Sequence, residues 1–151
     1  MATGHGILTI FCSAFFAVLF LQSGFDKIID WKGNKEFHTS KFEHTLLKNY
    51  SVYTLVIIMV SEICCGLLSV AGLVSCLLSH DRQLSHYADC LACAIIICLF
   101  FGLRISKDYR GAAGVVPYFI ASIIAIYFSY LNYDNSLFRW QFSTWSFGSL
   151  K

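Results

Sequence analysis

Residues 49–79 read NYSVYTLVIIMVSEICCGLLSVAGLVSCLLS and carry a single charged side chain, Glu62, in 31 positions. An α-helix needs roughly 20 apolar residues to cross a bilayer core of about 30 Å, so this stretch is long enough to span a membrane. It lacks the polar stripe, with a period of 3.6 residues, that the water-facing side of a soluble helix shows. The stretch therefore predicts a transmembrane helix with one carboxyl group near its middle depth.

Three other stretches have the same character. Residues 7–25 and 111–133 contain no Asp, Glu, Lys or Arg, and residues 83–103 contain only Asp89. In the whole chain of 151 residues 57% are hydrophobic and 13% are charged, about half the charged share of a soluble domain. We therefore predict an all-α fold, a single-domain integral membrane four-helix bundle over residues 1–151, with spans at about 7–29, 50–79, 86–104 and 111–133.

The segments between and after the spans carry their own signals. Residues 26–48 combine five lysines with apolar side chains. We expect the first helix to extend past the membrane, turn at Gly33-Asn34 and continue as a helix that lies on the surface. Residues 134–151 carry five aromatic side chains among Ser and Thr, and Trp and Tyr prefer the level of the lipid headgroups, so we expect a partly irregular interfacial tail.

Lysine and arginine are unevenly distributed over the connections. The first and third loops together carry eight, whereas the N-terminus, the second loop and the tail together carry three. By the positive-inside rule, loops 1 and 3 are expected to be cytoplasmic. The net charge of +2 is too small to indicate nucleic acid as a partner, so the lipid bilayer is the expected partner. We expect the chain to cross a bacterial cytoplasmic membrane several times.

Glu62 is the strongest candidate for a functional residue. A charge at that depth costs roughly 2.5–3.5 kcal/mol on insertion scales, so the side chain is expected to face the bundle interior and find a partner. It would serve either as a proton or ligand site, or as a structural hydrogen bond between helices. Gln22, Asp26 and Lys27, at the end of the first span, are the other buried polar candidates. Lys27 is expected either to reach the membrane surface or to point inward at a carboxylate such as Glu62 or Asp26.

Two further groups are weaker candidates. Arg104, Lys107 and Arg110 lie within seven residues at the membrane edge, where they would hold a lipid headgroup or a ligand or only set the topology. Cys90 and Cys93 form a CxxC pair among seven cysteines, and two thiols three residues apart in a helix can approach closely enough for redox chemistry. Cysteine is also a common packing residue in apolar helices. The spacing of the five histidines indicates no metal or haem site.

Three pieces of the sequence, in order, resemble the DoxX family. They are FLQSGFDKIIDWKGNKEF (residues 20–37), Glu62 followed by Gly66, and RISKDYRGA (residues 104–112). The resemblance covers about residues 8–130 and implies four membrane spans. Some members of that family are membrane subunits of thiosulfate:quinone oxidoreductases, and others are linked to thiol redox balance in the cell envelope.

The resemblance implies a small integral membrane subunit linked to quinone-dependent or thiol redox chemistry, for which quinone is the candidate cofactor. In that hypothesis Glu62 contacts a proton or a quinone, and Lys27 and Arg104 lie near the headgroup. The alternative hypothesis is a non-catalytic subunit that anchors or stabilises a larger envelope complex, with other membrane proteins as partners. A proton or small-solute carrier is less favoured, since one buried carboxylate makes a poor pathway. Whether the chain is itself an enzyme stays open.

Overall fold

The computed structural model describes the backbone of residues 4–79 and 82–148, and the side chains of residues 6–79 and 82–130. The regular elements in this part of the chain are all helical. They are α1 (Gly4–Ile29), α2 (Trp31–Phe42), the short 3₁₀ helix η1 (Lys48–Tyr50), α3 (Ser51–Leu78), α4 (Gln83–Ile105) and α5 (Tyr109–Gly148). Four segments are long and apolar enough to cross a membrane: Gly6–Ile29, Lys48–Leu78, Gln83–Ile105 and Tyr109–Tyr130. The predicted all-α fold with four membrane-spanning helices is confirmed.

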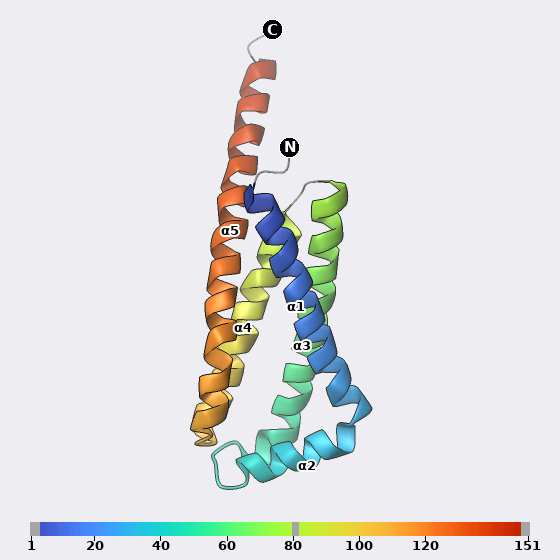
Figure 1. The fold of residues 1–151 in the computed structure, drawn as a ribbon, viewed down its shortest axis with the longest axis vertical. Coiled ribbons are helices and arrows are strands. Elements are labelled where there is room, and N and C mark those ends of the chain that lie inside the picture. The colour runs from blue at the N-terminus through green and yellow to red at the C-terminus, as the bar shows by residue number, and fades with distance from the viewer. Residues whose placement is uncertain (1–3, 80–81, 149–151) are drawn as a thin grey trace.

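The four long helices lie side by side along the long axis of the molecule, and α2 crosses one end of them (Figure 1). The first helix α1 packs mainly against α3, α4 packs against α5, and α3 packs against α4. The start of α1 and the last turns of α5 lie at the end opposite α2 (Figure 1). The α1–α2 and α4–α5 turns therefore share one end of the bundle, as an even number of spans requires.

The bundle places large apolar side chains outside and small polar ones inside. Phe11, Ile57 and Phe101 are each more than 60% exposed, whereas six of the described serines are buried inside the bundle. Hydrocarbon is the solvent that suits such a surface, and small residues let helix backbones approach closely inside a membrane. The central apolar cluster is correspondingly small and consists of Phe16, Phe20, Cys65, Ala92, Ile95, Ile96 and Ala125.

Two glycines allow the closest contacts of α3. A Cβ atom at Gly66 would lie 2.6 Å from Cγ of Leu21 in α1, and a Cβ atom at Gly72 would lie 2.8 Å from the backbone nitrogen of Ser85 in α4. Real Cβ atoms do not approach other atoms so closely. Both helix pairs therefore depend on the absence of a side chain at these positions.

The surface helix α2 begins earlier than we predicted. The predicted turn at Gly33-Asn34 is wrong, because the chain leaves the helical conformation at Asp30, with φ −105° and ψ 54°. The Asp30 carboxylate accepts a hydrogen bond of 3.1 Å from the Gly33 N–H and so caps the new helix. Gly33 and Asn34 consequently lie within the first turn of α2.

The predicted partly irregular tail is also wrong for the backbone of residues 134–148, because α5 continues without interruption to Gly148. No Gly or Pro lies between Pro117 and Gly148, so nothing in that sequence ends the helix. A helix of 40 residues is about 60 Å long, roughly twice the bilayer core. The last turns therefore extend past the other helices (Figure 1). The tail's aromatic side chains and residues 149–151 lie outside the described residues.

Candidate functional site

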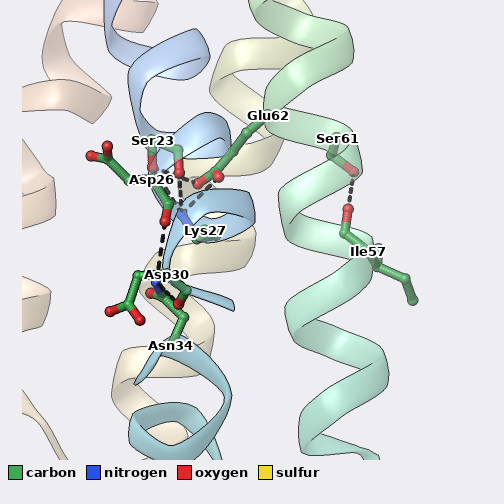
Figure 2. A network of polar contacts seen from close by, with 8 residues as sticks. All are labelled: Ser23, Asp26, Lys27, Asp30, Asn34, Ile57, Ser61 and Glu62. Carbon is green, nitrogen blue, oxygen red and sulfur yellow. Dashed lines mark hydrogen bonds and ion pairs between the residues drawn. The ribbon is translucent and has the colours of Figure 1, made fainter. Parts of the chain in front are cut away.

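Glu62 lies at the α1–α3 interface and is only 1% exposed. Its Oε2 atom is 2.7 Å from Nζ of Lys27, and its Oε1 atom accepts a hydrogen bond of 3.1 Å from the Ser23 hydroxyl. Lys27 also donates to the Ser23 hydroxyl and to its backbone oxygen, at 2.9 and 3.2 Å. Figure 2 shows these three side chains converging between the two helices; we name them the Glu62 centre.

Helical spacing explains how the sequence builds this centre. Ser23 and Lys27 are four residues apart and therefore lie on one face of α1. Between them Gly24 packs against Ile63, so the backbone of α1 can approach α3 at the level of Glu62. Lys27 consequently turns inward to the carboxylate and does not reach for the membrane surface.

Two of the predicted buried residues are not buried. Gln22 and Asp26 are exposed, so the prediction that they belong to a buried polar group is wrong. Each precedes a member of the Glu62 centre by one residue, which rotates it by about 100° around the helix axis, away from α3. The Asp26 backbone oxygen, not its carboxylate, contacts the Asn34 amide at 3.5 Å.

The contacts of the Glu62 centre indicate what it does. Both carboxylate oxygens have a donor, and the charge of Glu62 is matched by the charge of Lys27. Removing one partner of such a buried pair usually costs about 3–5 kcal/mol, because the other charge is left without compensation. The centre is therefore a polar link between α1 and α3, and its carboxylate is already engaged.

A second buried acid, Asp89 in α4, has the opposite character. It is 1% exposed, and among the described residues no donor forms a hydrogen bond with either of its carboxyl oxygens. The Ser129 hydroxyl of α5 donates to the backbone oxygen of Ile126, at 3.1 Å. A buried carboxyl group without donors is held far more cheaply as the neutral acid than as the anion.

A histidine and a cysteine lie beside this acid. His86 Nδ1 is 3.0 Å from Oγ of Ser129, and His86 Nε2 is 3.8 Å from Sγ of Cys90. The tautomer of His86 decides whether Nδ1 donates to the Ser129 oxygen or accepts from its hydroxyl. In the neutral tautomer that carries its proton on Nδ1, Nε2 presents its lone pair to the Cys90 thiol. We name Asp89, Ser129, His86 and Cys90 the Asp89 centre.

The predicted CxxC pair belongs to this region. Cys90 is exposed on the outer side of α4, whereas Cys93 is buried, and all seven cysteines are free. Cys90 lies seven residues, or about 10 Å, from the first residue of α4. Its thiol therefore lies nearer one surface of the bilayer than its middle.

Asp89 was not among the candidates from the sequence, although a signal for it existed. It is the only charged side chain in residues 83–103, which is the same argument that selected Glu62. His86 and Cys90 are four residues apart, so a helix places them on one face. Ser129 lies in another helix, and nothing in the sequence indicates that it meets them.

The cations at the α4–α5 turn lie apart from both centres, at the surface. Arg104, Lys107 and Arg110 are exposed, and the Arg104 guanidinium lies 4.8 Å from the centre of the Tyr109 ring. Asp108, between them, pairs with Lys41 of α2 at 2.7 Å and accepts a hydrogen bond from the Gly111 N–H at 2.8 Å. These two contacts hold the pKa of Asp108 below its ordinary value.

The described residues contain no group of three or more His, Cys, Asp or Glu that could hold a metal ion. No family model, no curated protein and no solved structure matches this chain. The two centres and the membrane-spanning fold are therefore the features of the chain that bear on its function.

Proposed function

We propose that this chain is a DoxX-like membrane protein of the bacterial cytoplasmic membrane, and that its Cys90–Cys93 pair exchanges electrons with membrane quinone. The order of the three DoxX-like sequence pieces and the four spans support the family. The single observation that carries the redox function is the contact of 3.8 Å between the Cys90 thiol and His86 Nε2. It pairs an exposed thiol with a base on the side of α4 that lipid reaches.

His86 is oriented for this role by Ser129. A hydrogen bond of 3.0 Å to Ser129 orients the imidazole ring, and in the tautomer with its proton on Nδ1 the Nε2 atom accepts the thiol proton. Because the thiolate is the reactive form of cysteine, this proton transfer increases the reactivity of Cys90. Cys93, one turn further along, is the second thiol of the pair.

The proposed reaction is balanced between the dithiol and the quinone. The two S–H bonds of Cys90 and Cys93 break, one S–S bond forms, and the quinone takes up two electrons and two protons to become a quinol. Residues three apart on a helix have Cβ atoms about 5–6 Å apart, whereas a disulfide requires about 3.5–4.5 Å. The turn must tighten when the disulfide forms, which favours a bond that is readily reduced again.

Reconstituted protein in lipid nanodiscs tests the proposal. A water-soluble short-chain quinone is added, and both the quinol formed and the thiols lost to maleimide labelling are measured. We expect two thiols to be lost for each quinol. Cys93→Ser should abolish disulfide formation, and His86→Phe should slow the reaction at least tenfold near neutral pH.

Cys98→Ser provides the matched control, since Cys98 is also exposed on α4 but does not belong to the pair. It should behave like the wild-type protein. If the wild-type protein reduces no quinone, or if Cys93→Ser loses thiols as the wild-type protein does, the redox function is refuted.

The Glu62 centre favours a second candidate function, an anchoring or stabilising subunit of an envelope complex. Both oxygens of Glu62 are already paired, which supports a structural role for this residue and not the contact with a quinone that the sequence suggested. Extraction in mild detergent separates the two candidates. An anchoring subunit should leave the membrane with partner proteins, whereas isolated protein with full redox activity would contradict this function.

A further inference from the structure

An apolar groove lies between α4 and α5 near the end of the bundle that α2 crosses. It has a volume of about 230 Å³ and is lined by Ile96, Ile97, Phe100, Val116 and Phe119, with no polar surface exposed in it. Its walls belong to two membrane-spanning segments, so it opens toward the hydrocarbon of the bilayer. A flexible hydrocarbon chain is the ligand that matches such walls.

The groove is aligned with a cation at the membrane edge. Ile97, Phe100 and Arg104 are spaced by three and four residues, which places them in one row along α4. Tyr109 and Val116 are seven residues apart and form the corresponding row on α5. The Arg104 guanidinium lies 4.8 Å from the centre of the Tyr109 ring, so the two rows meet where the groove ends.

This end of the groove carries an excess of positive charge. Arg104, Lys107 and Arg110 are exposed at the turn. The acid among them, Asp108, is engaged by Lys41 at 2.7 Å and by the Gly111 N–H at 2.8 Å. The three cations therefore keep their charge for a ligand that reaches the turn from the bilayer.

We propose that the α4–α5 groove and the turn below it bind one anionic phospholipid. An acyl chain occupies the groove, and the phosphate group lies against Arg104, with Lys107 and Arg110 beside it. Charge distinguishes this occupant from a quinone, whose uncharged head gains nothing from three cations. This site is independent of the proposed redox function, because it shares no residue with the Asp89 centre.

Native mass spectrometry of the full chain in detergent tests the site. The protein is titrated with phosphatidylglycerol or with phosphatidylcholine of the same acyl chains. Each basic residue near an anionic surface contributes about fivefold in affinity. We therefore expect Arg104→Gln/Lys107→Gln/Arg110→Gln to lose preference for phosphatidylglycerol by on the order of 100-fold.

The chain offers a control with the same change of charge. Lys32, Lys35 and Lys48 are exposed at the same end of the molecule but lie at α2 and η1, away from the groove. Lys32→Gln/Lys35→Gln/Lys48→Gln should keep most of the preference. If this control loses as much preference for phosphatidylglycerol as the Arg104/Lys107/Arg110 variant, only the overall charge attracts the lipid, and the proposed site is refuted.

A second variant tests the groove without changing any charge. Ile97→Trp fills the groove and should weaken binding of phosphatidylglycerol, while Arg104→Lys in the same titration should largely retain it. Unchanged binding by Ile97→Trp would overturn the proposal. Glycerol phosphate should not compete; if it displaces the lipid at equal concentration, the ligand is a free phosphate group and the acyl chain plays no part.

Discussion

At the scale of single residues, the two buried acids differ in whether their carboxyl oxygens have hydrogen-bond donors. Glu62 has a lysine and a serine as partners, whereas neither oxygen of Asp89 accepts a hydrogen bond from the described residues. Burial alone therefore does not define the role of a carboxyl group in this bundle. The partners decide it, and they come from other helices.

Replacing Lys27 should lower the unfolding free energy more than replacing Glu62. Lys27→Met leaves a carboxylate that is 2% exposed without its counter-ion, and we expect a loss of about 3–5 kcal/mol in unfolding free energy. Glu62→Met should cost less, since the Lys27 side chain is 18% exposed and can turn toward the surface. Unfolding in detergent, followed by circular dichroism, measures both.

The double variant Lys27→Met/Glu62→Met completes this cycle. It should be more stable than Lys27→Met, because no charge is left buried. If the two single losses simply add in the double variant, the ion pair does not link α1 to α3.

The Asp89 carboxyl group should be replaceable at little cost to stability. Asp89→Asn keeps the volume and removes no hydrogen bond, so its unfolding free energy should change by less than about 1 kcal/mol. Ser13→Ala, which removes the hydrogen bond of 3.1 Å to Ser85, is a control of similar depth and should cost about 0.5–1.5 kcal/mol. A loss above about 3 kcal/mol for Asp89→Asn would show that the acid has a strong partner.

At the scale of the elements, the α1–α3 pair depends on close approach at Gly66. In Gly66→Ala the new Cβ atom would lie 2.9 Å from the backbone nitrogen of Leu21, which cannot move without moving α1. We expect a loss of about 1–3 kcal/mol and a weaker Glu62 centre. Gly114→Ala meets no atom within 4 Å and should be neutral or stabilising by up to about 1 kcal/mol. Equal effects of the two substitutions on unfolding would contradict this packing.

The attachment of α2 to the α4–α5 turn should depend on pH. The pKa of Asp108 is lowered by its bond to Lys41, so the ion pair stabilises the folded state above the ordinary pKa of 3.8 and is lost as the pH falls below it. Hydrogen exchange of α2 should therefore accelerate in this range. Asp108→Asn should remove the acid-dependent step; if the step persists in this variant, the ion pair does not hold α2.

His38 in α2 should add a separate step at higher pH. Burial lowers the pKa of this imidazole below 6.5, so the folded state favours the neutral ring. Stability is therefore lost as the pH falls from about 6.5 through the lowered pKa, because the unfolded chain binds the proton first. His38→Gln should abolish this step in hydrogen exchange and leave the step of Asp108 unchanged. If the step persists in His38→Gln, it belongs to another titratable group.

At the scale of the whole molecule, the sequence was sufficient for the spans but not for the contacts between them. Long charge-poor stretches predict membrane helices because hydrocarbon excludes charge. This prediction does not require knowing which helices pack against each other. The predicted α1–α2 turn at Gly33-Asn34 lies too late in the chain, because a capping aspartate, Asp30, ends the helix before the glycine. The pairing of Lys27 with Glu62 was one of two alternatives, and only the crossing of α1 and α3 selects it. The meeting of His86 with Ser129 depends on the packing of α4 against α5 and had no sequence signal.

The order in which the charges occur along the chain has a consequence for biogenesis. The ribosome delivers α1, with Lys27, before it delivers α3, with Glu62. Lys27 is therefore synthesised before Glu62 enters the translocon. Pairing with Lys27 can then offset the insertion penalty of Glu62, which is roughly 2.5–3.5 kcal/mol. The order of synthesis therefore brings the lysine of α1 into the membrane before the glutamate of α3 has to enter it.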